Sequence, residues 1–441
     1  MGARLSDSPL YAHLWGTDEL RAIFDERSRL ESWLDILAAL ARCQAGLGII
    51  PTAAATEITQ RARVDALDLD LVAAQTRATG HSTLGLINGL QRILGEQARE
   101  YVYYGATVQD LTDTWFGLVM REVSRIVARD TAAIERALLD LAARHRDTRM
   151  AGRTHGQPGA PTTFGLKAAS WADEIHRHRE RLRHGGPRWA VGQLAGAVGT
   201  LAFFGADGPR LRAALCAELG LADPGISWLT ARDRIAEFGH LLAMICATLA
   251  RIGAEVYELQ RPEIGELREP ATPGAVSSIT MPQKRNPELA EHLDTLARLA
   301  RSSATVLLEG MVGQHERDGR SWKAEWIALP EVCLLTGAAL QSARTIVTGL
   351  EVDPAAMLRN LPDEQLVEQV LAGLSAQLGK HRAQQLLHEV LRESPATGES
   401  LQARLVELGV ADAAQVKAWL DRDPVHVAGL MIDHVVARGT S

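Results

Sequence analysis

The segment SSITMPQKRNP, at residues 277–287, combines residue types that can act on an anion. It places the hydroxyl of Ser278, the cation of Lys284 and the amide of Asn286 around a Met-Pro pair. A run broken by Pro and Gly, REPATPGAV, precedes it, and an apolar pattern of helical period follows. A loop with these groups can bind a carboxylate and present a proton acceptor. We therefore treat it as one wall of a polar pocket.

Two further polar clusters stand beside predicted long helices, YYGATVQDLTDT at 103–114 and GRTHGQPGAPTTFG at 152–165. Backbone N–H groups are free at helix ends, so clusters placed there can bind anions. The candidate residues of these two clusters are Thr107, Gln109, Thr154, His155 and Gln157.

Each cluster also has a simpler structural interpretation. Thr107 and Asp110 are typical helix N-cap residues. His155 suits a solvated turn, and Asn286 before a proline suits the start of a turn. Taken singly, each is better explained in this way. Taken together, the three clusters favour converging walls of one pocket.

Long helices must position these clusters. Along 238–259, apolar residues alternate in spacings of 4 and 3, which predicts a long helix with a heptad seam. Similar patterns predict helices near 115–138, 171–182 and 289–307. Because several of these helices are apolar on more than one face, we expect an all-α bundle that forms a homo-oligomer.

The chain of 441 residues is long enough for several domains. We predict an N-terminal helical domain at 1–106, a central long-helix bundle with the polar loop at 107–350, and a C-terminal helical domain at 351–441. Aromatic residues make up only 5% of the chain, which favours helices over sheets.

Composition excludes several classes of function. The net charge of −7, with acids and bases interspersed, gives no indication of nucleic-acid binding. The apolar run LLAMICATLA is shorter than the roughly 20 residues that span a bilayer, and no signal-peptide pattern is present. We therefore expect a cytoplasmic protein without a membrane partner. The four cysteines are widely spaced and no dinucleotide fingerprint occurs, so we expect reduced thiols and no cofactor or metal.

The loop at 277–287 resembles the signature of the fumarase/aspartase superfamily, Gly-Ser-Ser-x-Met-Pro-x-Lys-x-Asn. The residues in register are Ser278, Met281, Pro282, Lys284 and Asn286. The other two clusters are similar to the superfamily's Thr-Ser-x-Asp and Thr-His elements. Similarity runs over nearly the whole chain, and three ordered motifs make the match specific.

The resemblance implies a fumarase/aspartase-type fold, with a twenty-helix core in a homotetramer whose active sites are shared between subunits. It also implies anti β-elimination from a small dicarboxylate, with Ser278 as the base and His155 as the general acid. A free serine hydroxyl is a poor base, so donors and cations must lower its pKa. The residues expected to bind substrate are Thr107, Gln109, Thr154, Gln157, Lys284, Asn286, Arg317, His81 and Trp322.

The sequence departs from the superfamily pattern in both serine motifs. Ile279 replaces the second serine of the loop, and Val108 replaces the serine of the first motif. If the loop slips by one residue, Ser277 competes with Ser278 for the role of base.

Other departures concern the branch of the superfamily. Trp322 and Trp326 stand where adenylosuccinate lyases bind a nucleotide phosphate, which an indole cannot neutralise. Trp228 and Tyr103 replace a Gln and a His of those lyases. Since Trp322 and Trp326 are four residues apart, they fit helix packing or a subunit interface as well as a pocket wall.

We therefore expect a lyase of a small succinyl compound that releases fumarate, with C–N cleavage as in nitrosuccinate lyases. The segments WKAEWIALPE and WLTARDRIAEF make 3-carboxy-cis,cis-muconate cycloisomerase the main alternative. An adenylosuccinate lyase and a non-catalytic structural relative are weaker alternatives.

Overall fold

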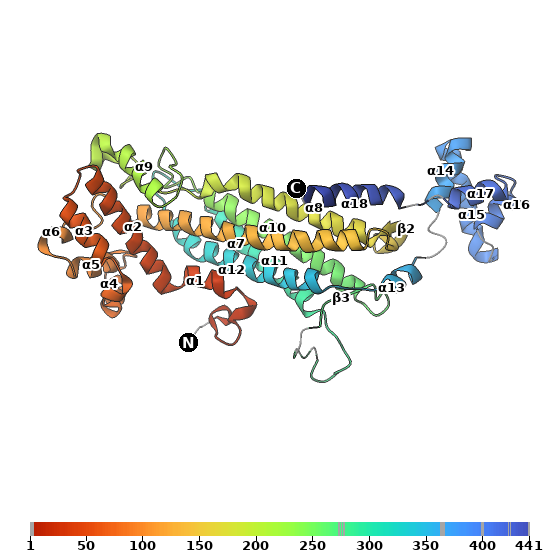
Figure 1. Cartoon of the computed structure of the whole chain (residues 1–441), viewed down its shortest axis with the longest axis horizontal. Coiled ribbons are helices and arrows are strands. Elements are labelled where there is room, and N and C mark those ends of the chain that lie inside the picture. The colour runs from red at the N-terminus through yellow and green to blue at the C-terminus, as the bar shows by residue number, and fades with distance from the viewer. Residues whose placement is uncertain are drawn as a thin grey trace. The chain divides into compact units, whose positions relative to one another are not determined.

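The structure, a computed structural model, is built almost entirely of helices, which confirms the predicted all-α class (Figure 1). The described residues are 4–271, 274, 276, 278–361, 367–397, 401–421, 423 and 425–439. Ser277, the alternative base, lies outside the described residues. The homotetramer stays a prediction.

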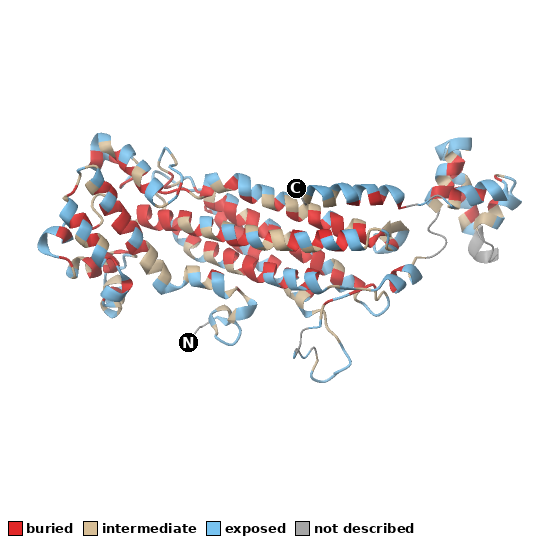
Figure 2. Ribbon diagram, in the orientation of Figure 1, coloured by how far each residue is buried: buried red, intermediate tan, exposed pale blue. Residues whose placement is uncertain are grey.

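Five long helices carry rows of buried residues (Figure 2). They are α7 (Val108–Arg144), α8 (Phe164–Trp189), α10 (Asp233–Leu259), α11 (Glu288–Glu309) and α12 (Gly319–Gly349). The predicted seam of α10 is buried along its whole length, from Phe238 at 0% exposed to Leu259 at 1%. Burying such a side chain contributes about 1.5–3 kcal/mol, so this seam is a major source of stability.

Two of these helices, α10 and α12, are long and apolar enough to cross a membrane. Within their most apolar windows, 72% and 61% of the residues are buried inside the protein. Burial of this kind is typical of core helices. The absence of a membrane partner stays a prediction.

The chain divides into two compact units. The first unit comprises Met1–Thr131, Arg177–Arg251 and His292–Ser342, and the second comprises Ala132–His176, Ile252–Glu291 and Ala343–Ser441. Each boundary falls inside one of the five long helices. The three-part division expected from the sequence stays a prediction.

The first unit contains the shorter helices of the N-terminal half. They are α1 (Asp18–Phe24), α2 (Glu26–Gly46), α3 (Thr52–Arg61), α4 (Leu69–Thr79), α5 (Leu84–Arg92), α6 (Glu96–Arg99), α9 (Gly208–Glu218), and the 3₁₀ turns η1 (Leu5–Asp7), η2 (Ala12–Leu14), η3 (Val64–Ala66) and η4 (Ala202–Asp207). Leu40 of α2 packs in one buried cluster with Leu194, Phe204, and Leu211 and Leu215 of α9. This cluster fixes the chain that precedes α9 against α2.

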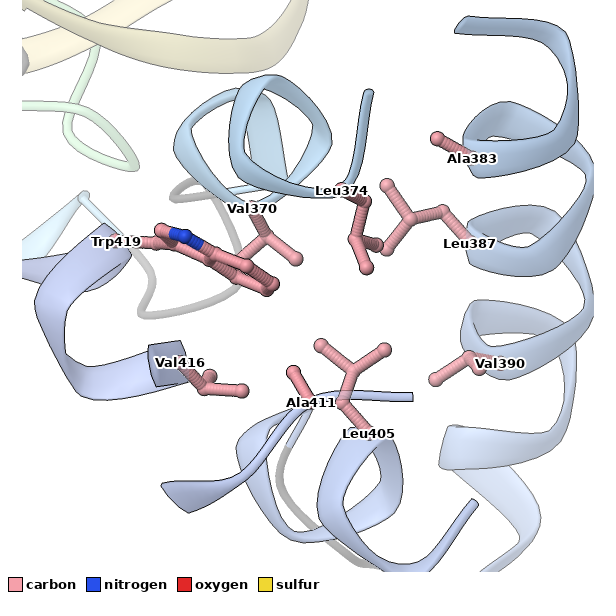
Figure 3. Close-up of a cluster of buried hydrophobic side chains, with 9 residues drawn as sticks. All are labelled: Val370, Leu374, Ala383, Leu387, Val390, Leu405, Ala411, Val416 and Trp419. Carbon is pink, nitrogen blue, oxygen red and sulfur yellow. The ribbon is translucent and has the colours of Figure 1, made fainter. Parts of the chain in front are cut away.

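Among the described residues, the second unit contains the remaining helices and the four short strands. They are β1 (Arg149–Thr154), β2 (Gln157–Thr163), β3 (Leu267–Arg268), β4 (Glu351–Val352), α13 (Pro354–Arg359), α14 (Val367–Leu378), α15 (Lys380–Thr397), α16 (Leu401–Glu407), α17 (Ala413–Leu420) and α18 (His426–Gly439). Helices α14 to α17 share a small core of their own, which includes Val370, Leu374, Leu387, Leu405 and Trp419 (Figure 3).

The last helix, α18, belongs to a different environment from α14 to α17. Arg146, which follows α7, forms two hydrogen bonds of 2.8 Å with the carboxylate of Asp433. Arg438 pairs with Asp173 of α8 at 2.5 Å. The chain therefore returns to the long helices after the small core.

Candidate active site

The first polar cluster forms the start of α7, and Asp110 holds it in place. The Asp110 carboxylate accepts hydrogen bonds from the backbone N–H groups of Thr107 (2.9 Å), Ala195 (2.7 Å) and Gly196 (3.2 Å). Burial raises the pKa of Asp110 to about 7, although these three donors favour the ionised form. Asp110 is the third residue of α7 and therefore not the N-cap itself; its carboxylate instead accepts from the backbone of Thr107, which precedes the helix, and of two distant residues.

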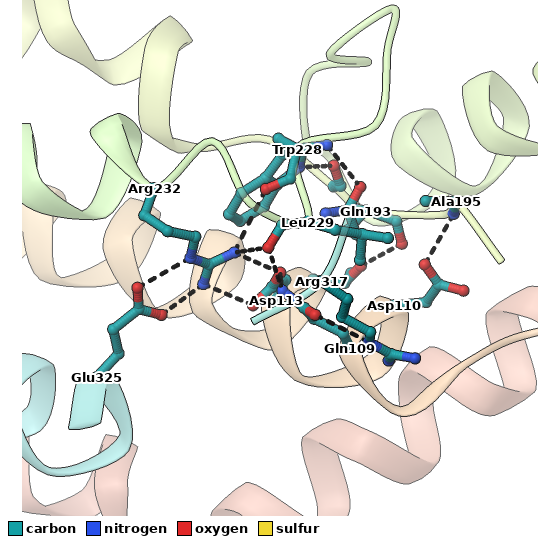
Figure 4. A network of polar contacts seen from close by, with 12 residues as sticks. Gln109, Asp110, Asp113, Gln193, Ala195, Trp228, Leu229, Arg232, Arg317 and Glu325 are labelled. Atoms are coloured by element: carbon teal, nitrogen blue, oxygen red, sulfur yellow. Dashed lines mark hydrogen bonds and ion pairs between the residues drawn. The ribbon is translucent and has the colours of Figure 1, made fainter. Parts of the chain in front are cut away.

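Gln109 connects this helix start to two distant segments (Figure 4). Its Nε2 donates to the carbonyl of Leu229 (2.7 Å) and to Asp113 (3.0 Å), and its Oε1 accepts from Nε of Arg317 (3.2 Å). The Nη2 of Arg317 is buried and has no partner among the described residues. The predicted residues Gln109 and Arg317 thus meet two residues beyond Thr107, and Nη2 of Arg317 is available for a ligand.

A buried ion network lies beneath this group and was missed by the sequence analysis. Arg232 pairs with Asp113 at 2.8 Å and with Glu325 at 2.9 Å, and all three side chains are at most 3% exposed. Burial opposes the charge on Arg232, but the two carboxylates raise its pKa. The guanidinium also lies 5.1 Å from the ring of Trp228. Because Asp113 accepts from Gln109, the network fixes Gln109 in turn.

His81 caps a short helix of the same unit. Its Nδ1 accepts hydrogen bonds from the N–H groups of Thr83 (3.4 Å) and Leu84 (3.2 Å) at the start of α5. This arrangement assigns the imidazole proton to Nε2, which faces away from the cap. Tyr103 stands before the same helix start as Thr107, and burial together with the nearby Asp110 raises its pKa.

Trp322 and Trp326 pack edge to face on α12, with ring centroids 4.8 Å apart. Trp322 is only 8% exposed. The indole nitrogens of both residues are buried and have no hydrogen-bond partner in the part of the chain that is described. Trp326 also lines a cavity of the first unit, and the choice between helix packing, a subunit interface and a substrate contact stays a prediction.

The second polar cluster is a β-hairpin, whereas the sequence analysis expected a loop. β1 and β2 pair with Thr154 opposite Gln157, so His155 and Gly156 form a two-residue turn. Both turn residues have positive φ, 55° and 75° respectively, as a type I′ turn requires. The hairpin places Thr154, His155 and Gln157 at an exposed tip.

An ion pair anchors this hairpin close to its turn. Arg153 forms hydrogen bonds of 2.6 and 3.0 Å with Glu266, whose side chain is fully buried. Asn360 donates to the same carboxylate at 2.9 Å. His155 itself has no hydrogen-bond or ion-pair partner among the described residues, so its imidazole is free to meet a ligand.

In the signature loop, Oγ of Ser278 already accepts one hydrogen bond. The backbone N–H of Met281 donates to Oγ of Ser278 at 3.0 Å. A donor on this oxygen favours its ionised form, which is the direction that a serine base needs. Ile279, which replaces the second serine, is 94% exposed.

The end of this loop is anchored and cationic. Arg285 pairs with Glu351 at 2.7 Å, and its carbonyl accepts from Gln260. Beside it, a cavity of about 580 Å³ is lined by residues that include Lys284, Asn286, Arg261 and Arg268. Glu258 also lines this cavity and pairs with Arg261 at 3.4 Å, so Lys284 and Arg268 supply its excess positive charge. An excess of positive charge suits a dicarboxylate.

The predicted site residues therefore fall into two groups. Thr107, Gln109, Arg317, His81 and Trp322 belong to the first unit. The hairpin and the signature loop, with Thr154, His155, Gln157, Ser278, Lys284 and Asn286, belong to the second. Among the described residues, no group of three or more His, Cys, Asp or Glu side chains is arranged to hold a metal.

Comparison with known proteins identifies the family. A family model described as Lyase matches residues 15–300. An N-acetyl-S-(2-succino)cysteine lyase from Dickeya dadantii is 40% identical over 96% of this chain and 94% of that one. The chain belongs to the fumarase/aspartase superfamily of lyases. A 3-carboxy-cis,cis-muconate cycloisomerase from Pseudomonas aeruginosa is 38% identical over 93% of this chain and 91% of that one.

Solved structures of the superfamily share the fold. The crystal structure of a fumarate lyase from Mesorhizobium sp. BNC1 matches with a TM-score of 0.88 and 33% identity, covering 97% of this chain and all of that one. Membership of the fumarase/aspartase superfamily, in the branch of adenylosuccinate lyases and cycloisomerases, confirms the resemblance found in the sequence. The protein is an enzyme of the lyase class, and the roles of its site residues stay predictions.

Proposed function

We propose that this lyase releases fumarate from a small S-succinylated thiol by anti β-elimination. What carries the proposal is the 40% identity, over nearly the full chain, to a relative named N-acetyl-S-(2-succino)cysteine lyase. A second relative of that name is 38% identical over 99% of this chain. C–S cleavage therefore takes precedence over the C–N cleavage expected from the sequence, which stays an alternative.

In the proposed step, Oγ of Ser278 takes a proton from the carbon next to one carboxylate. The electron pair left on carbon spreads into that carboxylate, which then carries two negative charges. As the C=C bond forms, the C–S bond breaks and its electrons leave with sulfur. The products are fumarate and a thiol, whose proton comes from His155 or from water. The cations at Lys284 and Arg268 support the doubly charged intermediate.

We also propose that the active site is assembled from more than one copy of the chain in a homotetramer. Two features support this proposal. The predicted base and acid lie on exposed segments, and the two groups of site residues belong to different compact units.

Purified protein assayed with a panel of substrates tests the reaction. The panel holds N-acetyl-S-(2-succino)cysteine, nitrosuccinate, an N-succinylated amine and 3-carboxy-cis,cis-muconate. We expect fumarate, followed by its ultraviolet absorbance, and an equal amount of thiol, titrated with a thiol-reactive dye. Turnover of carboxymuconate alone would instead support the cycloisomerase, which the relative from Pseudomonas aeruginosa makes the second candidate.

A further inference from the structure

The first unit contains a cavity of about 510 Å³ between helices α2, α4, α7 and α12. Aromatic side chains make much of its wall, among them Trp33, Trp115 and Trp326. The rings of Trp33 and Trp115 are 6.2 Å apart and edge to face. Pockets that bind organic ligands typically measure about 300–1,000 Å³ and have apolar walls of this kind.

Several polar atoms of the residues that line this cavity are buried without a partner. They are Nε1 of Trp33, Nε1 of Trp326, Nε of Arg29 and Oγ1 of Thr112. No hydrogen bond to them is present among the described residues. Buried polar groups are nearly always satisfied, so these donors indicate a ligand that supplies acceptors. Arg77 adds a second cation to the wall, and one carboxylate, Glu26, lies 3.6 Å from Nη2 of Arg29, so the cations exceed the anions by one.

Three elements connect this cavity to the polar group at the start of α7. Ser82 of the cavity follows His81 directly. Thr112 lies one helical turn beyond Gln109 on α7, and Trp326 lies one turn beyond Trp322 on α12. Residues three and four apart on a helix share a face. The cavity therefore continues the surface on which substrate contacts are predicted.

We propose that this cavity binds the thiol half of the substrate, a group that joins a hydrocarbon body to a carboxylate and an amide. This assignment rests on the proposed function. The aromatic wall covers the hydrocarbon part, the indole N–H groups donate to the amide carbonyl, and Arg29 faces the carboxylate. Residues 29, 33 and 326 thereby set which leaving groups the lyase accepts.

Trp33→Phe tests the assignment because it keeps the aromatic body and removes one donor. The assay compares N-acetyl-S-(2-succino)cysteine with 2-(methylthio)succinate, which carries the same succinyl half and a minimal leaving group. We expect kcat/KM for the first substrate to fall about 3- to 10-fold more than for the second, as the loss of one hydrogen bond predicts. Trp189→Phe is the matched control, since its indole donates to Ser124 at 3.0 Å and lies outside the residues that line this cavity.

Arg29→Gln provides a second variant at a partly exposed position, with its side chain 34% exposed. Its effect should depend on the carboxylate of the thiol half. We expect about a 10-fold or greater loss on the acid and a smaller loss on the corresponding carboxamide.

The outcomes separate the two proposals. No fumarate from either substrate with the unmodified enzyme overturns the proposed function and this assignment with it. The unmodified enzyme releases fumarate in the second outcome, but both variants and the Trp189→Phe control change kcat/KM equally for all substrates. That outcome overturns the assignment alone.

Discussion

At the scale of single residues, the contact between Met281 and Ser278 bears most directly on the chemistry. A backbone N–H that already points at Oγ stabilises negative charge there without any rearrangement of a side chain. This donor is independent of residue 281's side chain, so it persists when Met281 is replaced. We expect the cation of Lys284, which lies in the same loop, to act in the same direction.

Ser278→Ala should abolish turnover, because no other group in the loop is proposed to take the proton. Steady-state release of fumarate measures the loss, and calorimetric titration with the unreacted substrate checks that binding persists. Retention of the normal kcat in this variant would remove Ser278 from the role of base.

The effect of His155→Asn should depend on the leaving group. A thiol has a pKa near 8.5 and departs readily as its anion, whereas an amine departs only when it is protonated. We expect a loss of at least ~100-fold for an N-succinylated amine and a much smaller loss for an S-succinylated thiol. Equal losses with both substrates would show that His155 does not act as the acid.

Asp110 should make stability depend on pH. Its pKa rises from 3.8 in the unfolded chain to about 7 in the folded protein, so between these values the folded state binds more protons. Stability from this group is complete below about pH 4 and falls as the pH approaches 7, by on the order of 4 kcal/mol at most. The asparagine of Asp110→Asn does not titrate, so the melting temperature of this variant serves as the reference. From pH 4 to pH 8, the melting temperature of the wild type should fall relative to that of Asp110→Asn.

At the scale of elements, the long helices could be predicted because their pattern is local. The seam of α10 repeats at intervals of 4 and 3, and the structure buries every member of it. The β1–β2 hairpin could not be predicted in this way. Its turn is His-Gly, without the Asn-Gly or Asp-Gly pair that usually marks a type I′ turn, and prolines interrupt β2.

The network of Arg232 could not be predicted either, since its partners are far away in the sequence. Asp113 is 119 residues from Arg232 and Glu325 is 93 residues away. A single sequence contains no signal that pairs them. The three polar clusters were recognisable because each is contiguous, whereas the contact of Gln109 with Arg317 spans 208 residues.

Arg232→Met should destabilise the protein strongly, because it leaves two buried carboxylates without a counter-charge. We expect the free energy of unfolding, measured by denaturant titration, to fall by about 3–5 kcal/mol. The matched control is Arg298→Met, whose side chain is 70% exposed beside Asp294 and should contribute at most about 1 kcal/mol. Similar losses in the two variants would contradict the importance of the buried network.

At the scale of the whole molecule, the proposed sharing of sites between copies of the chain leads to an expectation about hybrids. If sites are shared between copies, a tetramer that mixes Ser278→Ala and His155→Asn chains contains some sites with both residues intact. Co-refolded or co-expressed hybrids should then recover part of the activity on an N-succinylated amine, where both residues are needed. Hybrids as inactive as the parent variants would indicate that each chain supplies its own complete site.

The path of the chain after α13 determines what limited proteolysis can release. The small core of α14 to α17 lies between two segments, α13 and α18, and α18 is held to the long helices by exposed pairs such as Arg146 with Asp433. A protease cut after α17 would therefore leave α18 in place without a covalent link, because Ala428, Gly429 and Ile432 are buried there. Raising the salt concentration screens only the exposed pairs, which contribute at most about 1 kcal/mol each, so the severed C-terminal peptide should stay bound.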